Sequence, residues 1–352
     1  MNITRRLVAV AAAMAASLPA VAGTIAPRYV AHDLGTLGGA TAIATGIDDA
    51  GRVIGTSDRG GEQSAHAFVT GPDGVGMLDL CPAQALSCGA TAISPGGLVV
   101  GNYETALGVT GFTVNRDGSA FATLGPTHGP RTTAPAAINV SNRIVGSENF
   151  GGSAGTRAFA ASGADGALFD LGAITGPDGF SYGLAINDSN NGAGCSLTAD
   201  GKLHAYIQGG LGRHIQDIGT LGGAQSCAWA MNPSGTVAGW SDTTVPDAAH
   251  AFYSRWPYAA LVDIGTLGGL ASHASGLNDA GHVVGNAENS GVRYRTHAFL
   301  YDIDGARLVD LNKLVELPRG LVLTQAAAIN ARDQIVANGS NGHAFLLTPA
   351  GE

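Results

Sequence analysis

A histidine and an aspartate recur in this chain at a fixed separation of 13 residues. The pairs are His66 and Asp79, His204 and Asp217, His250 and Asp263, and His297 and Asp310. An imidazole beside a carboxylate can act as a general acid or base. A catalyst needs one such site, however, and not one in every repeat. We therefore interpret these pairs as structural hydrogen bonds or ion pairs, and we predict no catalytic residues.

The two ends of the chain carry the halves of one further pair. Asp33 stands near the N-terminus without a histidine 13 residues before it, and His343 stands near the C-terminus without an aspartate 13 residues after it. We expect His343 to pair with Asp33 where the ends meet. Arg157 precedes Asp170 by the same 13 residues, and Gly111 replaces the histidine of the unit in which Thr123 replaces the aspartate.

Five carboxylates follow a glycine at the end of an apolar run, just before a variable polar segment. They are Asp58, Glu104, Glu148, Asp242 and Glu288. Binding residues concentrate on loops held by a rigid scaffold, and a ring of like charge can attract cations or a basic ligand. We interpret the five as a candidate ligand-facing collar, with solvated loop ends as the alternative. No loop has the spacing of a calcium site, and we predict no metal and no cofactor.

The aromatic residues are few, and all three tryptophans fall in one repeat. Trp229, Trp240 and Trp256 hint at a localised site, although packing of the sheet is the alternative. Asparagines recur at one turn of each repeat, where we expect each to cap its own backbone. They are Asn139, Asn187, Asn232, Asn278 and Asn330.

The paired residues belong to a repeat whose clearest copies read DLGTLGG. Successive copies start at residues 33, 79, 123, 170, 217, 263 and 310, at intervals of 44 to 47 residues. Short apolar runs separated by Asp-Gly or Asn-Asp-x-Gly turns indicate four short strands per unit. Seven such units predict an all-β fold, a seven-bladed β-propeller with four antiparallel strands per blade. An open solenoid and a two-sheet sandwich are the competing folds.

The ends of the chain support ring closure. Tyr29 to Leu34 is the fourth strand of a unit without the first three, and His343 to Leu347 is a third strand with no fourth. We expect the N-terminal strand to close the last blade and to cover its edge. The sequence thus predicts a single propeller domain over residues 28–348.

The motifs also resemble a known family. His-Ala-Phe occurs at residues 66–68, 250–252, 297–299 and 343–345, together with DLGTLGG and the Asn-Asp-x-Gly turns. This combination is similar to the HAF-repeat family of extracellular bacterial proteins, over roughly residues 30–348. The resemblance implies export and a repeat fold, and it implies no enzyme activity. The second and third units depart most, at Gly111, Thr123 and Arg157.

The N-terminus and the cysteines indicate export. Arg5 and Arg6, an apolar run from Leu7 to Ala16 and small residues up to Ala22 predict a signal peptide over residues 1–22. An even cysteine count in an exported chain suggests disulfides. We pair Cys81 with Cys88 across a short loop and Cys195 with Cys227 by elimination, with free thiols as the alternative. The protein is expected to be secreted or periplasmic in a bacterium.

The net charge of the chain restricts the classes of binding partner. The net charge is −9, and it becomes −11 once the two arginines of the signal peptide are removed. An acidic surface argues against nucleic acid and against anionic membranes. We predict a monomeric, non-catalytic binding module for an extracellular glycan, peptide or protein, without membrane insertion after signal cleavage. The alternatives are an extracellular polysaccharide hydrolase or lyase on a propeller scaffold and a purely structural surface protein.

Overall fold

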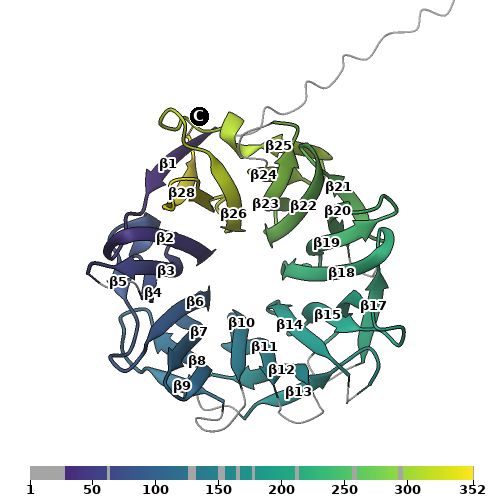
Figure 1. Ribbon diagram of the computed structural model, residues 1–352, viewed down its shortest axis with the longest axis horizontal. Helices are drawn as coiled ribbons and strands as arrows, with labels where there is room; N and C mark the ends of the chain where they lie inside the picture. Colours follow the sequence, from purple (N-terminus) through teal and green to yellow (C-terminus); the bar gives the residue numbers. More distant parts are fainter. Residues whose placement is uncertain are drawn as a thin grey trace, which may run out of the picture.

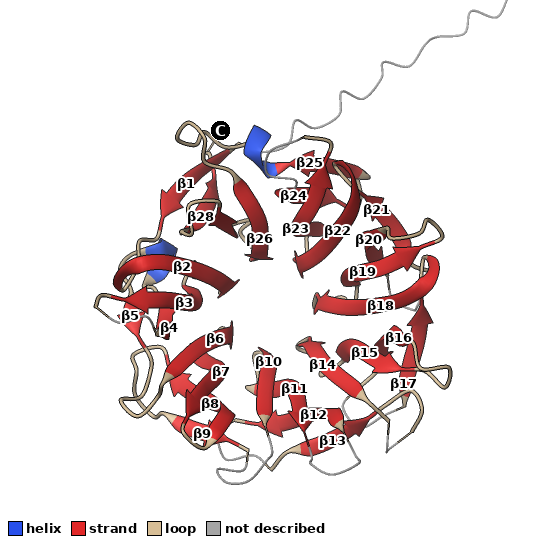
Figure 2. Ribbon diagram, in the orientation of Figure 1, coloured by secondary structure: helices blue, strands red, loops and turns tan. Residues whose placement is uncertain are grey.

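The computed structural model describes residues 28–351, apart from 62–63, 126–131, 150–154, 164–166, 177–178, 211–213, 256–259 and 292–295. The predicted signal peptide and Trp256 lie outside the described residues. Antiparallel sheets stand around a central axis like the blades of a propeller, with the first strand of each repeat innermost (Figures 1 and 2). The all-β propeller class is therefore confirmed. No helix in the described ranges is long and apolar enough to span a membrane.

Four of the sheets each contain four consecutive strands. The first holds β2 (Gly38–Ile47), β3 (Val53–Arg59), β4 (Ala65–Val69) and β5 (Leu78–Asp79). The second holds β6 (Ser87–Ile93), β7 (Leu98–Thr105), β8 (Gly108–Asn115) and β9 (Ala122–Leu124). The third holds β10 (Thr133–Ile138), β11 (Arg143–Asn149), β12 (Thr156–Ser162) and β13 (Phe169–Gly172). The fourth holds β14 (Ser181–Ile186), β15 (Gly192–Leu197), β16 (Leu203–Gln208) and β17 (Ile215–Gly219).

The fifth four-stranded sheet joins the two ends of the chain. It holds β26 (Leu323–Ile329), β27 (Ile335–Gly339), β28 (Ala344–Pro349) and β1 (Tyr29–Asp33). Strand β1 pairs antiparallel with β28, so that Asp33 lies opposite Phe345. The predicted closure of the last sheet by the N-terminal strand is confirmed. Two short 3-10 helices, η1 (Pro72–Gly74) and η3 (Leu311–Lys313), lie in connections.

The predicted count of seven separate blades is wrong. Within the described ranges only five four-stranded sheets stand alone, and the fifth and sixth repeats form one eight-stranded sheet. It holds β18 (Gly222–Met231), β19 (Val237–Thr243), β20 (Ala249–Ser254), β21 (Val262–Gly265), β22 (Gly268–Leu277), β23 (His282–Asn289), β24 (Thr296–Asp302) and β25 (Arg307–Asp310). Strand β21 covers only residues 251–253 of β20, and the uncovered Ala249 pairs in parallel with Ala271 of β22. The seven sequence repeats therefore give six hydrogen-bonded sheets.

The repeated His-Ala-Phe motif supplies the core between neighbouring sheets. The aromatic residue is fully buried in six of the repeats, as Phe68, Phe112, Phe159, Tyr206, Phe252 and Phe299. Burying one such side chain contributes roughly 1.5–3 kcal/mol. Opposite Phe299 stands Gly285, where a Cβ would lie 2.0 Å from the oxygen of His273 and 2.9 Å from the Phe299 ring. Glycine at this position therefore lets the aromatic ring lie against the middle of the sheet.

Candidate functional site

The predicted basic–acidic pairs lie between the third and fourth strands of the repeats. Imidazole Nδ1 lies 2.8–2.9 Å from a carboxylate oxygen in each pair: His66–Asp79, His204–Asp217, His250–Asp263, His297–Asp310 and His343–Asp33. Arg157 forms the equivalent ion pair with Asp170 at 2.7 Å. The predicted pairs are thus formed, including the one that joins the two ends of the chain.

Each of these aspartates also anchors a turn. The second oxygen of Asp217 accepts a hydrogen bond from the N–H of Gly219 at 2.7 Å, and Asp263 does the same for Gly265. Asp33, Asp79, Asp170 and Asp310 accept the N–H two residues ahead in the same way. The carboxylate is therefore held by a histidine or arginine on one side and by its own turn on the other, which explains the recurring motif structurally.

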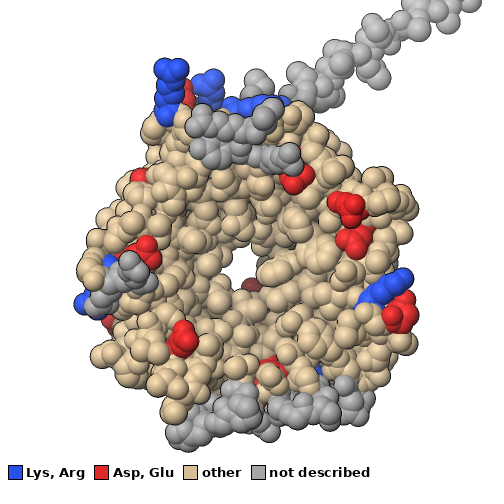
Figure 3. All heavy atoms as spheres, in the orientation of Figure 1, with Lys and Arg blue, Asp and Glu red and all other residues tan. Residues whose placement is uncertain are grey.

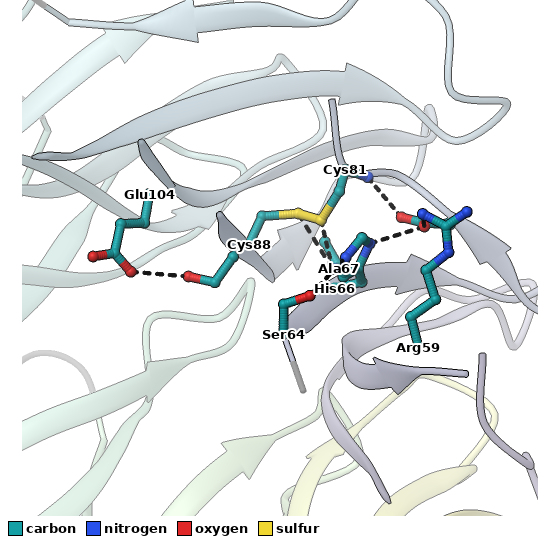
Figure 4. The surroundings of a disulfide bond; sticks show 9 residues. Arg59, Ser64, His66, Ala67, Cys81, Cys88 and Glu104 are labelled. Atoms are coloured by element: carbon teal, nitrogen blue, oxygen red, sulfur yellow. Dashed lines mark hydrogen bonds and ion pairs between the residues drawn. A yellow bond between two sulfur atoms is a disulfide. The ribbon is translucent and has the colours of Figure 1, made fainter. Parts of the chain in front are cut away.

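One histidine–aspartate pair lies beside a disulfide (Figure 4). Cys81 and Cys88 are bonded, and both sulfurs accept from the N–H of Ala67. In other repeats a serine hydroxyl accepts this N–H, as Ser226 does from Ala205 and Ser272 from Ala251. The ligand atoms of His66, Asp79 and Cys81 lie within 4.8 Å of one another. Because the sulfur of Cys81 is part of the disulfide, this group offers no thiolate for a metal.

The predicted acidic collar is bonded to its own sheets. Asp58 accepts from the hydroxyl of Thr41 at 2.7 Å, and Glu104 accepts from the hydroxyl of Ser87 at 3.1 Å. The backbone N–H groups of Gln225 and Leu270 donate to Asp242 and Glu288 respectively, both at 3.1 Å. Glu148 is buried. No three of these carboxylates approach within 4.8 Å of one another in the described part of the chain, so they do not form a compact cluster of metal ligands.

A cavity of about 850 Å³ lies instead where the innermost strands meet. Side chains from β2, β6, β10, β14, β18, β22 and β26 line it. Figure 3 shows the opening at the centre of the ring. Most of the wall is small or aliphatic, with Ala44, Ala134 and Ala327 as examples. Its volume falls in the range of pockets that hold small ligands.

One sector of this channel is aromatic. Trp229 of β18 lines it, and 49% of the surface of this residue is exposed. Trp240 of β19 lies against His273 of β22, with ring centroids 5.7 Å apart and the planes inclined by 50°. Tyr182 of β14 lines the neighbouring part of the wall. The tryptophan cluster that the sequence placed in one repeat therefore faces the channel, as far as the described residues include it.

A disulfide lies directly behind this aromatic sector. Cys195 of β15 is bonded to Cys227 of β18, as predicted, and both are buried. Tyr182 is the cross-strand partner of Cys195, and Trp240 is the cross-strand partner of Cys227. The covalent link therefore fixes the spacing of the two strand pairs that carry Tyr182 and Trp240.

The channel wall carries little charge. The lining includes the amides Asn102, Asn286 and Gln325 and the imidazole of His273, and its described residues include no carboxylate, lysine or arginine. Burial lowers the pKa of His273, against a smaller opposite effect of Glu288. The imidazole is thus neutral at neutral pH, and the described wall is an uncharged mixture of aromatic, aliphatic and amide groups.

Carboxylates gather where the innermost strands end. Asp49, Asp188 and Asp279 occupy the same position in three of the turns that follow these strands. Burial raises the pKa of Asp279, and the negative charges of Asp188 and Asp49 raise it further. Asp188 and Asp49 accept N–H groups of Val140 and Ala331 from neighbouring repeats. This end of the ring is therefore negative, unlike the channel wall.

Sequence reasoning missed several residues of the channel. His273 and Tyr182 line it, yet neither belongs to a repeated motif. The available signal is positional, because both stand in the stretch that aligns with the strand of Trp229. A period of two along the innermost strands would have placed them on the inner face.

Comparisons in sequence show no family for this chain. No model of a protein family matches it. No curated protein matches it either.

Comparisons of structure give distant likenesses. Oligogalacturonate lyase from Vibrio parahaemolyticus has a TM-score of 0.62 at 10% identity, over 90% of this chain and 93% of that one. The β-propeller domain of the Trilobed protease from Pyrococcus furiosus, described as having an open velcro topology, has a TM-score of 0.54 at 11% identity. That match covers 89% of this chain and 96% of that one.

TolB from Acinetobacter baumannii has a TM-score of 0.51 at 11% identity, over 73% of this chain. This chain spans only 62% of the length of that protein. At such identities, similarity extends to the fold alone. The chain is a β-propeller similar in architecture to these proteins.

Proposed function

We propose that this protein is an exported, non-catalytic binding module whose ligand enters the central channel. The observation that carries the proposal is the aromatic sector of the channel wall, where Trp229 is half exposed inside a cavity of about 850 Å³. A large exposed indole in a concave site is a typical ligand contact. The ligand is an extracellular glycan, peptide or protein segment.

The chemistry of the described residues supports a role without catalysis. The histidine–aspartate pairs use their carboxylates to hold turns, and four collar carboxylates are bonded to their own innermost strands. A glycosidase on this scaffold would need two carboxyl groups about 5–10 Å apart facing one substrate. Among the residues that the structure describes, the channel lining contains one imidazole and no carboxylate, which makes the hydrolase or lyase alternative the weaker one.

Export rests on the sequence pattern of residues 1–22 and on the two disulfides. Disulfides persist in oxidising compartments and are rare in the cytosol. Both predicted bonds, Cys81–Cys88 and Cys195–Cys227, are present. The resemblance to the HAF-repeat family points to the same localisation, secreted or periplasmic.

The proposal is tested with a neutral fluorescent probe, N-phenyl-1-naphthylamine, titrated into the purified protein. We expect saturable binding that Trp229→Ala weakens. Ala134→Trp, which places a bulky side chain in the channel from strand β10, should also weaken it. Phe169→Ala is the matched control, since Phe169 is an exposed aromatic residue of the outer strand β13. Equal binding by all four proteins would show that the channel is not the site.

A further inference from the structure

The channel contains a platform whose chemistry is more specific than a general apolar pocket. Trp229 exposes about half of its side chain to the channel from the inner part of β18. Buried indoles pack against aliphatic neighbours, whereas a half-exposed one offers a flat apolar face to a ligand. This face lies in one sector, since the wall at β10 carries small residues such as Ala134 and Ala136.

The platform is held in place before any ligand arrives. Trp229 stands two residues after Cys227, whose disulfide to Cys195 fixes β18 to β15. Trp240 is the cross-strand partner of Cys227 and leans on His273 of the next repeat. An ordered site loses less conformational entropy on binding. The aromatic sector is therefore suited to a rigid ring and needs no rearrangement to receive one.

The remaining wall offers hydrogen bonds without charge. Asn102, Asn286 and Gln325 present amides, and Ser147 and Ser275 present hydroxyl groups. Such groups donate and accept at once, which suits a ligand rich in hydroxyl groups. A purely apolar ligand would leave them without partners at a cost of about 1–3 kcal/mol each where they are buried.

The negative charge at one end of the ring also restricts the charge of the ligand. The carboxylates of Asp49, Asp188 and Asp279 surround the turns that end the innermost strands, and Asp188 and Asp49 interact with Asp279 electrostatically. A field of one sign favours ligands of the other sign or of none. An anionic ligand is disfavoured here, and a strongly cationic one finds no carboxylate in the wall.

We propose that the channel binds a neutral saccharide, with the C–H face of one pyranose ring stacked on Trp229 and the hydroxyl groups bonded to the wall amides. This assignment rests on the proposed function, because it names the ligand class of the same channel. It does not depend on the collar or on the histidine–aspartate pairs.

The test is isothermal titration of the full mature chain with two sets of oligosaccharides. One set is neutral, made of glucose, galactose, mannose or xylose units, and the other is oligogalacturonate of equal length. We expect saturable binding of a neutral sugar, and no binding of oligogalacturonate at the same concentrations. Trp229→Ala should lower the affinity for the neutral sugar by about tenfold or more, and Trp229→Phe should lower it by less. Phe169→Ala should leave it unchanged, and the thermal midpoint of each variant checks folding.

The outcomes separate the two proposals. Binding of N-phenyl-1-naphthylamine in the channel without binding of any neutral sugar would overturn the saccharide assignment while the binding function stands. Failure of the probe and of every sugar would overturn both. Equal affinity for oligogalacturonate would overturn the assignment of a neutral ligand. Sugar binding that Trp229→Ala leaves unchanged would overturn the stacking on Trp229.

Discussion

The side-chain amide of Asn330 donates a hydrogen bond to the backbone oxygen of Asp48 at 3.0 Å, across 282 residues of chain. It is the last member of a ring, because each turn asparagine donates to the equivalent turn of the next repeat: Asn139 to Asn187, Asn187 to Asn232, Asn232 to Asn278, and Asn278 to Asn330. The series of side-chain donations stops at Asp48, since a carboxylate has no N–H to donate. Two contacts therefore join the ends of the chain and close the propeller: the pairing of β1 with β28 and the bond from Asn330 to Asp48.

Asn330→Ala should therefore lower the free energy of unfolding, because one side chain bonds both its own turn and the turn of the first repeat. Asn330 is buried, and its oxygen also accepts the N–H groups of Arg332 and Gln334. Leaving buried backbone groups without partners costs about 1–3 kcal/mol. Urea unfolding measures the loss. Asp49→Ala removes an exposed bond to the N–H of Ala331 in the same turn pair, and it should cost clearly less; equal losses would contradict the role of the buried ring.

A pH-dependent bond joins the sixth repeat to the last one. His282 Nδ1 lies 2.7 Å from Asp333 Oδ1. The hydrogen bond to Asp333 raises the pKa of His282, against the opposing effect of burial. Burial also opposes the shift at Asp333, but the bonds from His282 and Asn278 hold the pKa of Asp333 below its ordinary value.

The sign of the pH effect follows from these shifts. The contribution of His282 is fully present below its unfolded pKa of 6.5 and is lost as pH rises through the raised folded value. The contribution of Asp333 is present above 3.8 and is lost as pH falls through its lowered folded value. The pair therefore stabilises the fold most between about pH 4 and 6.5.

His282→Gln should lower the thermal midpoint most in that window. The difference from the parent protein should shrink as pH rises from 6.5 through the raised folded pKa of His282, since the parent histidine then loses its proton. Differential scanning fluorimetry from pH 4 to 9 measures both curves. A midpoint difference that stays constant over this range would show that the ion pair contributes nothing through its charge.

Much of the repeat architecture could be predicted from sequence because its signals are local. The spacing of His297 and Asp310 follows from a hairpin, and the half-units at both ends required β1 to meet β28. The number of separate sheets could not be predicted, because it depends on one parallel bridge between Ala249 and Ala271.

The site was less predictable, for a geometric reason. Each asparagine caps its own turn, which is a local contact. Its side-chain amide also bonds the next repeat, and the position of that repeat cannot be predicted from the local sequence. Asp58 was correctly placed at the end of β3, yet its bond to Thr41 depends on how β2 and β3 lie side by side. The channel-facing role of Tyr182 and His273 likewise depends on which side of the innermost strand turns inward.

The two disulfides should differ in their contribution to stability. Cys195–Cys227 closes 32 residues, and Cys81–Cys88 closes only seven. The chain-entropy estimate gives about 3.7 kcal/mol for the longer loop and about 2.5 kcal/mol for the shorter one. Replacing each pair by serines and measuring urea unfolding tests the order. The longer bond should also affect probe binding in the channel, because its neighbours Tyr182 and Trp240 line it, whereas the shorter bond should not.

Two buried tyrosines offer a matched comparison of hydroxyl groups. The hydroxyl of Tyr29, in the closing strand β1, is buried with no hydrogen-bond partner among the described residues. The hydroxyl of Tyr103 is bonded to Thr123 Oγ1 at 2.8 Å. A buried hydroxyl without a partner carries its full desolvation cost, whereas a bonded one recovers it.

Tyr29→Phe should therefore leave stability unchanged or raise it by up to about 1 kcal/mol. Tyr103→Phe should lower stability by about 1–2 kcal/mol, because it also leaves the threonine hydroxyl without its partner. Each variant removes one oxygen and keeps the ring, so the packing change is the same in both. Urea unfolding at neutral pH measures the two values. A larger loss at Tyr29 than at Tyr103 would mean that the hydroxyl in β1 has a partner that secures the closure, and that the closing strand depends on a polar contact as well as on its pairing with β28.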